Sequence, residues 1–181
     1  CSGAYFDNDL KLDTMLTPNS GRKFTSTELS NAQTITVRIK NLDDAATSGT
    51  YTVSYQVNGG TIVNENVSTA INAGGTLDYT FSTTANLSAV GDYTIRVFVK
   101  NPGDARIEND EQTYTVRHVN NDPVTLPFTE TFESAPVSEY RNSFFALNNL
   151  DRFDYTTSSI NGRLRTQIDS GMAINGSKSI T

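Results

Sequence analysis

Several kinds of residue are scarce in this sequence, and each scarcity excludes a class of function. The 181 residues include no tryptophan, one cysteine and one histidine. His118 would have to serve any Ser-His-Asp triad or zinc site, yet no serine-containing elbow and no second histidine accompany it. Neither a glycine-rich phosphate loop nor a dinucleotide-binding glycine motif occurs. We therefore expect a non-catalytic chain in which His118 has a structural or incidental role.

Basic residues are also scarce. The sequence contains 14 Lys and Arg against 20 Asp and Glu, a formal net charge of -6. Nucleic acids and anionic membranes need a basic face on their partner, so we expect neither as a partner. No apolar run approaches the roughly 20 residues of a membrane-spanning helix, so we expect no transmembrane segment. The abundance of Thr, Ser, Asn and Gly is typical of extracellular β-proteins and predicts a secreted location.

Both ends of the sequence indicate a piece of a longer protein. Cys1 is the only cysteine, so it cannot form an internal disulfide or a metal site. We favour an incidental thiol over the alternative, the lipid-bearing first residue of a mature bacterial lipoprotein. The start lacks the regions of a signal peptide, and residues 177–181 have the pattern of a strand that continues. We therefore expect further sequence beyond this chain.

The predicted strand 92–99 gives the strongest structural signal. Apolar and polar side chains alternate along it, which predicts a strand with one face in a core and the other in water. The motif Gly91-Asp92-Tyr93 resembles the tyrosine corner of Ig-like β-sandwiches, in which a Tyr hydroxyl bonds to the backbone a few residues upstream. We expect Tyr93 to anchor a late central strand. The residues predicted to face the core are Tyr93, Ile95, Val97 and Val99.

Other segments alternate in the same way and are separated by turn residues. Asn58-Gly59 between two of them predicts a tight hairpin, because both residues accept positive φ. A total of about seven short strands is the number expected for an Ig-like β-sandwich, and no window has a helical period. We therefore predict an all-β fold. The other predicted strands are 10–14, 34–41, 51–57, 61–67, 76–81 and 112–118.

A polar break at residues 120–123 divides the chain. We predict an Ig-like β-sandwich over residues 1–121 and the N-terminal part of a second, truncated β-domain over residues 122–181. A segment of about 60 residues rarely holds a core by itself, so the second domain is expected to be incomplete.

The first part resembles a known family in four motifs. In these motifs it is similar to the CARDB-like, Ig-like modules of secreted bacterial surface proteins. The resemblance implies an Ig-like sandwich at a bacterial cell surface. The motifs are Val37–Asn41, Tyr55–Gly60, Leu87–Tyr93 and Glu108–Gln112.

The second part resembles the opening of the cleaved-adhesin or MAM-like jelly-roll domains of Bacteroidetes. The motifs are Phe128–Glu133, Asp151–Asp154 and a small-residue strand from Gly171 to Ser177. The resemblance implies a partial jelly-roll-like domain after the Ig-like sandwich. It also implies a large protein exported by the type IX route, such as a gliding adhesin or a secreted protease or glycosidase with accessory modules.

Four acids at the start of the second part form a candidate calcium site. Glu130, Glu133, Asp151 and Asp154 offer hard carboxylate oxygens, which suit Ca²⁺. The jelly-roll resemblance also implies a structural calcium. A spacing of three in a strand, however, places Glu130 and Glu133 on opposite faces. The alternative is that these are solvated acids of an acidic secreted protein.

Thr14 is a candidate glycosylation site, because Asp13-Thr14-Met15 resembles the O-glycosylation acceptor triplet of Bacteroidetes secreted proteins. The remaining acids lie in predicted loops, and we do not favour them as metal ligands. They are Asp7, Asp9, Asp43, Asp44, Glu108, Asp110 and Glu111.

Aromatic residues of the second part offer a possible sugar-stacking platform, and surface glycans are therefore possible partners. Against this, tryptophan, the best stacking ring, is absent. The aromatic residues are Tyr140, Phe144, Phe145, Phe153 and Tyr155.

The sequence favours a non-catalytic stalk or adhesion module of a large secreted bacterial cell-surface protein. Its expected partners are other modules of the same chain, the secretion machinery or surface glycans. The alternative is an accessory module, binding substrate or carbohydrate, of a secreted protease or glycosidase.

Overall fold

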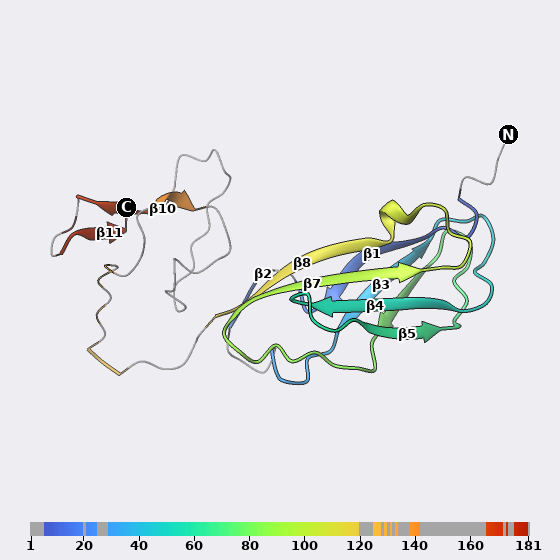
Figure 1. The fold of residues 1–181 in the computed structure, drawn as a ribbon, viewed down its shortest axis with the longest axis horizontal. Coiled ribbons are helices and arrows are strands. Elements are labelled where there is room, and N and C mark those ends of the chain that lie inside the picture. Colours follow the sequence, from blue (N-terminus) through green and yellow to red (C-terminus); the bar gives the residue numbers. More distant parts are fainter. Residues whose placement is uncertain are drawn as a thin grey trace.

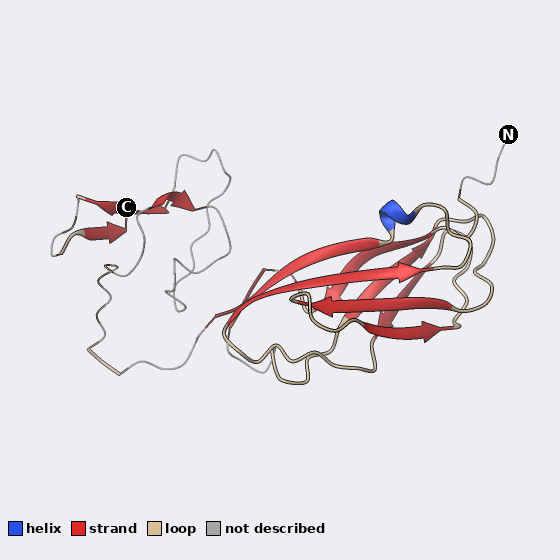
Figure 2. Cartoon of the chain, viewed as in Figure 1, coloured by secondary structure: helices blue, strands red, loops and turns tan. Residues whose placement is uncertain are grey.

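The chain forms an all-β structure, seen here in a computed structural model (Figure 1). The structure describes residues 6–19, 21–24, 29–119, 125–127, 129, 131, 133, 138–141, 166–171, 173 and 176–180. Eight strands build a sandwich of two sheets, with the order β2-β8-β7-β4-β5 in one and β1-β3-β6 in the other (Figure 2). The strands are β1 (Leu10–Thr17), β2 (Gly21–Phe24), β3 (Thr36–Asn41), β4 (Tyr51–Val57), β5 (Val63–Val67), β6 (Thr76–Thr80), β7 (Gly91–Lys100) and β8 (Glu111–Val119).

Strand β7 lies at the centre of the five-stranded sheet, between β4 and β8. Its inward side chains are buried as the alternation predicted, and Ile95, Val97 and Val99 have no exposed surface. The Tyr93 hydroxyl donates a 2.7 Å hydrogen bond to the Ala89 carbonyl, four residues upstream. The predicted tyrosine corner is therefore confirmed.

The opposite sheet presents a matching apolar face. Ile35, Val37 and Ile39 in and before β3 are fully buried, as are Leu10 and Leu12 of β1. Each of these strands covers the core with alternate residues, so the two sheets share one hydrophobic cluster. The predicted Ig-like β-sandwich is confirmed for this part of the chain.

The hairpin between β4 and β5 turns where the sequence predicted. Asn58 and Gly59 both have positive φ, at 50° and 69°. The Gly60 amide donates to the Val57 carbonyl at 2.9 Å, so the predicted turn is present over residues 57–60. The pairing of β4 with β5 begins only at Tyr55 and Val63, so the connection is longer than a two-residue hairpin.

Strand β2 is an addition that the sequence did not predict. The composition of residues 18–21 is that of a turn cluster, whereas Gly21–Phe24 pairs in parallel with β8. Four residues give too short a segment for a periodic signal, and the pairing partner lies far along the chain. Short edge strands of this kind are defined by their neighbour rather than by their own sequence.

Side chains close the gap between the sheets along the β1–β8 side. A bulge in β1 leaves Asp13 outside the pairing with β3. Gln112 of β8 donates to the carbonyls of Leu12 and Asp13, at 3.0 and 3.2 Å. The Met15 amide donates to the Tyr114 hydroxyl at 3.0 Å.

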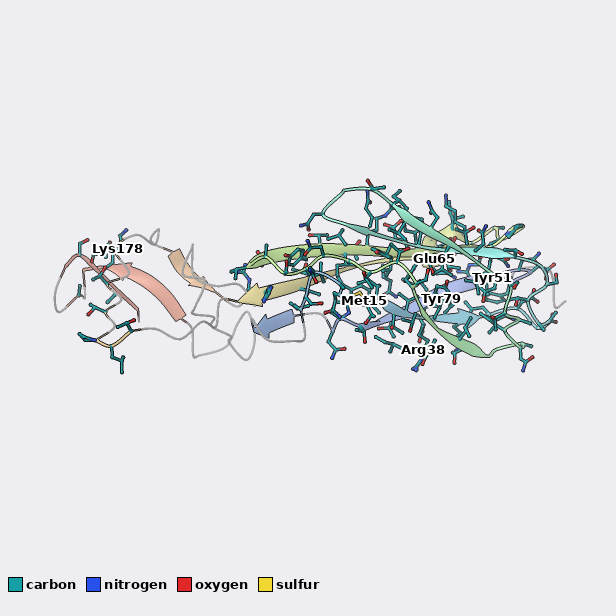
Figure 3. All side chains as sticks on the ribbon, turned by 90° about the horizontal axis from the view of Figure 1, so that it is seen from below. Met15, Arg38, Tyr51, Glu65, Tyr79 and Lys178 are labelled. Atoms are coloured by element: carbon teal, nitrogen blue, oxygen red, sulfur yellow. The ribbon has the colours of Figure 1, made fainter. Side chains whose placement is uncertain are left out.

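Glu65 closes the opposite side, where β5 and β6 face each other from different sheets (Figure 3). Its carboxylate accepts hydrogen bonds from the Tyr79 hydroxyl at 2.6 Å, the Ser82 hydroxyl at 2.7 Å and the amides of Ser82 and Thr83 at 3.0 and 2.9 Å. Partial burial raises the pKa of Glu65, but these hydrogen bonds outweigh burial and lower the pKa to about 2.

Beyond the sandwich, three short strands form a separate sheet with the order β11-β10-β9. They are β9 (Ser138–Arg141), β10 (Thr166–Ser170) and β11 (Lys178–Ile180). The predicted strand from Gly171 to Ser177 is wrong. Its described residues connect β10 to β11, and Gly171 and Gly176 have φ values of 139° and 88°, which break a strand. The domain boundary at 121/122 and the jelly-roll class of the second part stay predictions.

We predict that Glu65→Gln destabilises the sandwich in a pH-dependent way. The folded pKa is below the ordinary value of 4.5, so the carboxylate contributes stability above pH 4.5 and loses it as the pH falls toward 2. Urea unfolding should show a loss of about 1–2 kcal/mol at pH 7 that shrinks between pH 5 and pH 2. Asp7→Asn, at an exposed acid, is the control. A difference between Glu65→Gln and wild type that stays constant with pH would contradict the prediction.

Candidate functional site

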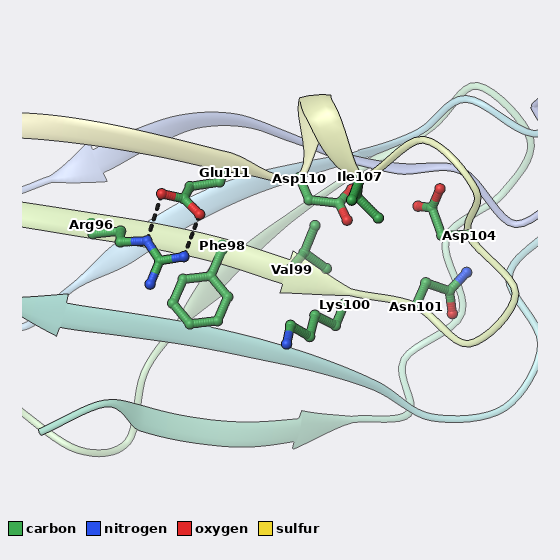
Figure 4. A pocket seen from close by; sticks show the side chains of 9 residues that line it. All are labelled: Arg96, Phe98, Val99, Lys100, Asn101, Asp104, Ile107, Asp110 and Glu111. Carbon is green, nitrogen blue, oxygen red and sulfur yellow. Dashed lines mark hydrogen bonds and ion pairs between the residues drawn. The ribbon is translucent and has the colours of Figure 1, made fainter.

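A hollow of about 400 Å³ lies on the outer face of the five-stranded sheet, beside a short 3-10 helix, η1 (Ile107–Asn109) (Figure 4). Phe98 forms its apolar floor. This side chain points away from the sandwich core, yet only 6% of it is exposed, because the Arg96 guanidinium lies 4.5 Å above its ring. We call this feature the η1 hollow. Its lining residues are Arg96, Phe98, Val99, Lys100, Asn101, Asp104, Ile107, Asp110 and Glu111.

One wall of the η1 hollow is an ion pair between neighbouring strands. Arg96 of β7 donates from Nε and Nη2 to the two carboxylate oxygens of Glu111 in β8. The hydrogen bonds from Arg96 lower the pKa of Glu111. This pair holds the guanidinium over Phe98.

Asp110 is a loop residue, as predicted, and connects η1 to β8, but it is only 8% exposed. The chain turns back through η1 and places Asp110 beside β7, where its carbonyl accepts the Val99 amide at 2.9 Å. Burial raises the pKa of Asp110 to about 7, and the charges of Asp104, Asp9 and Glu108 contribute to this rise.

Asp9, immediately before β1, is also a loop residue, and it is fully buried. Asn109 of η1 donates to Asp9 Oδ1 at 3.0 Å. Burial raises the pKa of Asp9 even though this hydrogen bond and Arg106 favour the charged form. Asp7, Asp43 and Asp44 lie in loops, as predicted, and are at least partly exposed. Glu108 and Glu111 are also exposed, but they lie in η1 and at the start of β8 rather than in loops.

The segment that enters the sandwich is fixed to the β7–β8 connection. Asn101 donates to the Asn8 carbonyl at 2.6 Å, and the Leu10 amide donates to Asp104 Oδ2 at 2.9 Å. Gly103 has a φ of 85°, and a Cβ there would lie 3.0 Å from Asn8 Nδ2. The connection therefore needs glycine at this close approach.

Of the predicted calcium ligands, only Glu133 falls within the described residues, since Glu130, Asp151 and Asp154 lie outside them. Glu133 anchors the turn before β11. Its carboxylate accepts the amides of Ser177 and Lys178, both at 2.8 Å, and the Ser177 hydroxyl. Those donors lower its pKa, the Ser177 hydroxyl most. The four-acid calcium site stays a prediction.

The structure also places several of the other predicted site residues. Thr14 is half-buried in β1, with its hydroxyl 3.5 Å from that of Tyr114, and its glycosylation stays a prediction. His118 is buried, and its Nδ1 donates to the Leu87 carbonyl at 2.9 Å. Of the predicted stacking aromatics, Tyr140 lies in β9. The others lie outside the described residues: Phe144, Phe145, Phe153 and Tyr155.

Two kinds of feature are absent from the part of the chain that the structure describes. No group of three or more His, Cys, Asp or Glu side chains is arranged to hold a metal ion there. Nor do those residues form any helix with the length and apolarity that a membrane span requires.

Comparison with known proteins gives similarity to solved structures only, because no family model and no curated protein matches the chain. The solution structure of the CARDB domain of a Pyrococcus furiosus protein is 18% identical, with a TM-score of 0.43, and the match covers 61% of this chain and 92% of that one. A crystal structure of that domain in complex with di-metal ions is 20% identical, with a TM-score of 0.46 and coverage of 65% and 95%.

A further match is a Pseudomonas fluorescens alkylpurine DNA glycosylase bound to DNA containing an abasic site analog. It is 11% identical, with a TM-score of 0.32, and the match covers 60% of this chain and 30% of that one. At these identities and scores, the matches assign no family and no function. The first two neighbours are CARDB domains, the class that the first part of the sequence resembles.

We predict that Glu133→Ala speeds amide hydrogen exchange at Ser177 and Lys178, because both amides lose their acceptor. The loss of roughly 1.4 kcal/mol of local stability corresponds to about tenfold faster exchange, measurable by NMR. Ser177→Ala is the matched control, since it removes the hydroxyl and keeps the Lys178 amide bond. Unchanged exchange in Glu133→Ala would show that the carboxylate does not anchor this turn.

Proposed function

We propose that this chain is a non-catalytic stalk or adhesion module of a large secreted bacterial cell-surface protein. The observation that carries the proposal is that the chain enters and leaves the sandwich at opposite ends (Figure 1). A module with this geometry extends a protein by its own length, whereas a module with adjacent ends forms a side branch.

Hydrogen bonds and strand pairing locate the two ends. The entering residues Asn8 and Leu10 bond to Asn101 and Asp104, which come after the last residue of β7. The leaving strand pairs His118 with Gly91, the first residue of β7. Ten residues of β7 span about 33 Å, and this length separates entry from exit.

The pairing of the terminal strands suits a load along this axis. A pull between the ends acts lengthwise on β1 against β3 and on β8 against β7, so the ladder hydrogen bonds bear the load together. The bonds from Gln112 and Tyr114 to β1 also join the entering and leaving strands directly. These features support a spacer that resists extension.

The finer parts of the proposal rest on the sequence resemblance. They are export by the type IX route, a gliding or adhesin type of parent protein, and partners among the modules of the same chain, the secretion machinery or surface glycans. Calcium bound by Glu130, Glu133, Asp151 and Asp154 is proposed on the same basis.

A second candidate function is an accessory module of a secreted protease or glycosidase. The η1 hollow favours it, because an apolar floor at Phe98 with charged walls at Arg96 and Glu111 is a surface that could bind a substrate segment. The intact mass of the native protein, with sequencing beyond both ends of this chain, separates the two candidates. Repeated β-modules support the stalk, and a single catalytic domain beside this chain supports the accessory module.

We predict that the sandwich resists force more strongly along its axis than at one end. Single-molecule pulling from residues 7 and 119 should require a higher unfolding force than pulling from residues 7 and 105, where Ala105 is an exposed residue of the β7–β8 connection. The second pair lies at the same end and peels the strands apart. Cys1→Ser in both samples removes the competing thiol. Equal forces in the two geometries would contradict a load-bearing role.

A further inference from the structure

Three oxygen atoms near η1 are buried without a hydrogen-bond donor. They are Asp9 Oδ2, Asn109 Oδ1 and Asp110 Oδ1, and among the described contacts none of them accepts a hydrogen bond. Asp9 is 0% exposed and Asp110 is 8% exposed, so water does not solvate these oxygens freely. We call these three residues the Asp9 cluster. Buried acceptors are ordinarily paired, so this concentration of unpaired oxygens calls for a positively charged or donating partner.

Among the described residues, the side chains around the Asp9 cluster supply one ion pair but no hydrogen bond to these three oxygens. Arg106 Nε forms an ion pair with Asp9 Oδ2 at 4.0 Å, beyond hydrogen-bond distance, and it donates a hydrogen bond to Glu108 at 3.1 Å. The Arg106 guanidinium also lies 5.0 Å from the centre of the Phe6 ring. Asp104 adds negative charge nearby, and its two oxygens already accept the amides of Leu10 and Arg106.

The cluster residues come from two segments held close together. Asn109 Nδ2 donates to Asp9 Oδ1 at 3.0 Å. The amide oxygen of Asn109 belongs to the same amide group, so it also lies near the Asp9 carboxylate. Asp110 is the next residue, and the bond between its carbonyl and the Val99 amide fixes its backbone. Asp110 also lines the η1 hollow, so solvent and ions have a route to it (Figure 4).

We propose that the Asp9 cluster binds a hard divalent cation of the Ca²⁺ class. The carboxylates of Asp9 and Asp110 and the amide oxygen of Asn109 are its protein ligands, and water from the η1 hollow completes the coordination. Calcium takes six to eight oxygen ligands in flexible geometry, and these include amide oxygens and water. A site with two acids agrees with the absence of a three-acid group among the described residues.

Such a cation would join the entering segment to the β7–β8 connection. Asp9 precedes β1, and Asn109 and Asp110 precede β8, so the ion would bridge residues about 100 positions apart. It would also neutralise the charge that Asp9, Asp104 and Glu108 direct at Asp110. This site is distinct from the four acids predicted in the second part of the chain.

Calorimetry of the 181-residue chain tests the proposal, with CaCl₂ or EDTA as the only difference between samples. Calcium should raise the Tm of the wild-type protein saturably, and at a free concentration about 100 times Kd it should lower the unfolding constant about 100-fold. Asp9→Asn and Asp110→Asn keep the side-chain shape and remove one charge each. Both should abolish the calcium-dependent rise while leaving the Tm in EDTA equal to or above that of wild type.

Asn109→Asp tests the same site by gain of charge. A third carboxylate should lower the Tm in EDTA, because like charges repel, and should enlarge the calcium-dependent rise. Damage to the fold would lower the Tm in EDTA without enlarging the calcium response, so a loss of Tm with no larger response counts against the proposal.

Two controls locate the ion. Asp7→Asn, at an exposed acid close in sequence, and Glu133→Gln, in the second part, should both respond to calcium as wild type does. A calcium response that persists in Asp9→Asn and Asp110→Asn, or is lost in Glu133→Gln alone, would overturn the assignment. So would a wild-type Tm that rises on acidification but ignores calcium, because a proton would then neutralise the cluster.

Discussion

The structure of this domain depends on the way in which β7 is enclosed. The strand is hydrogen-bonded to β4 on one side and β8 on the other, and its inward face fills the centre of the core. The tyrosine corner at Tyr93 fixes where the strand begins. Near the other end of β7, the Val99 amide donates to the Asp110 carbonyl, which fixes the segment after η1 against this strand. The strands β4 and β8 pair with β7 directly, β5 and β2 pair with those two strands in turn, and β1 of the other sheet packs against β7.

The two open sides of the sandwich are closed by polar side chains rather than by further strands. Gln112 and Tyr114 bond across to the backbone of β1 on one side, and Glu65 bonds across to Tyr79 and the residues after β6 on the other. Each bond joins residues from different sheets, so each restricts sliding of one sheet over the other. Hydrophobic packing alone is non-directional and would not restrict that motion as strongly.

The strands could be predicted from the sequence because alternation is a local signal. Ile95, Val97 and Val99 reveal their strand without any knowledge of the neighbours, and Asn58-Gly59 reveals its turn in the same way. Strand β2 could not be predicted, because its pairing with β8 depends on residues nearly 100 positions away. The Asp9 cluster was hidden for the same reason. Asp9 and Asp110 look like loop acids, and only the return of the chain through η1 buries them.

In the sequence, Phe98 was the residue from which the η1 hollow could have been predicted. It breaks the polar face of β7, and a large apolar residue on the outer face of a sheet needs a cover. The cover is Arg96 held by Glu111, and it depends on pairing between two strands that the sequence alone does not reveal.

The position of Glu65 has a consequence for how copies of such a domain behave beside one another. Strand β5 is an edge of the five-stranded sheet, and exposed edges readily pair with edges of other molecules. Glu65 lies on the inward side of this strand, the same side as Val63 and Val67. A foreign strand that paired there would have to bury this charge or displace its donors. An inward charge on an edge strand therefore opposes edge-to-edge pairing at β5.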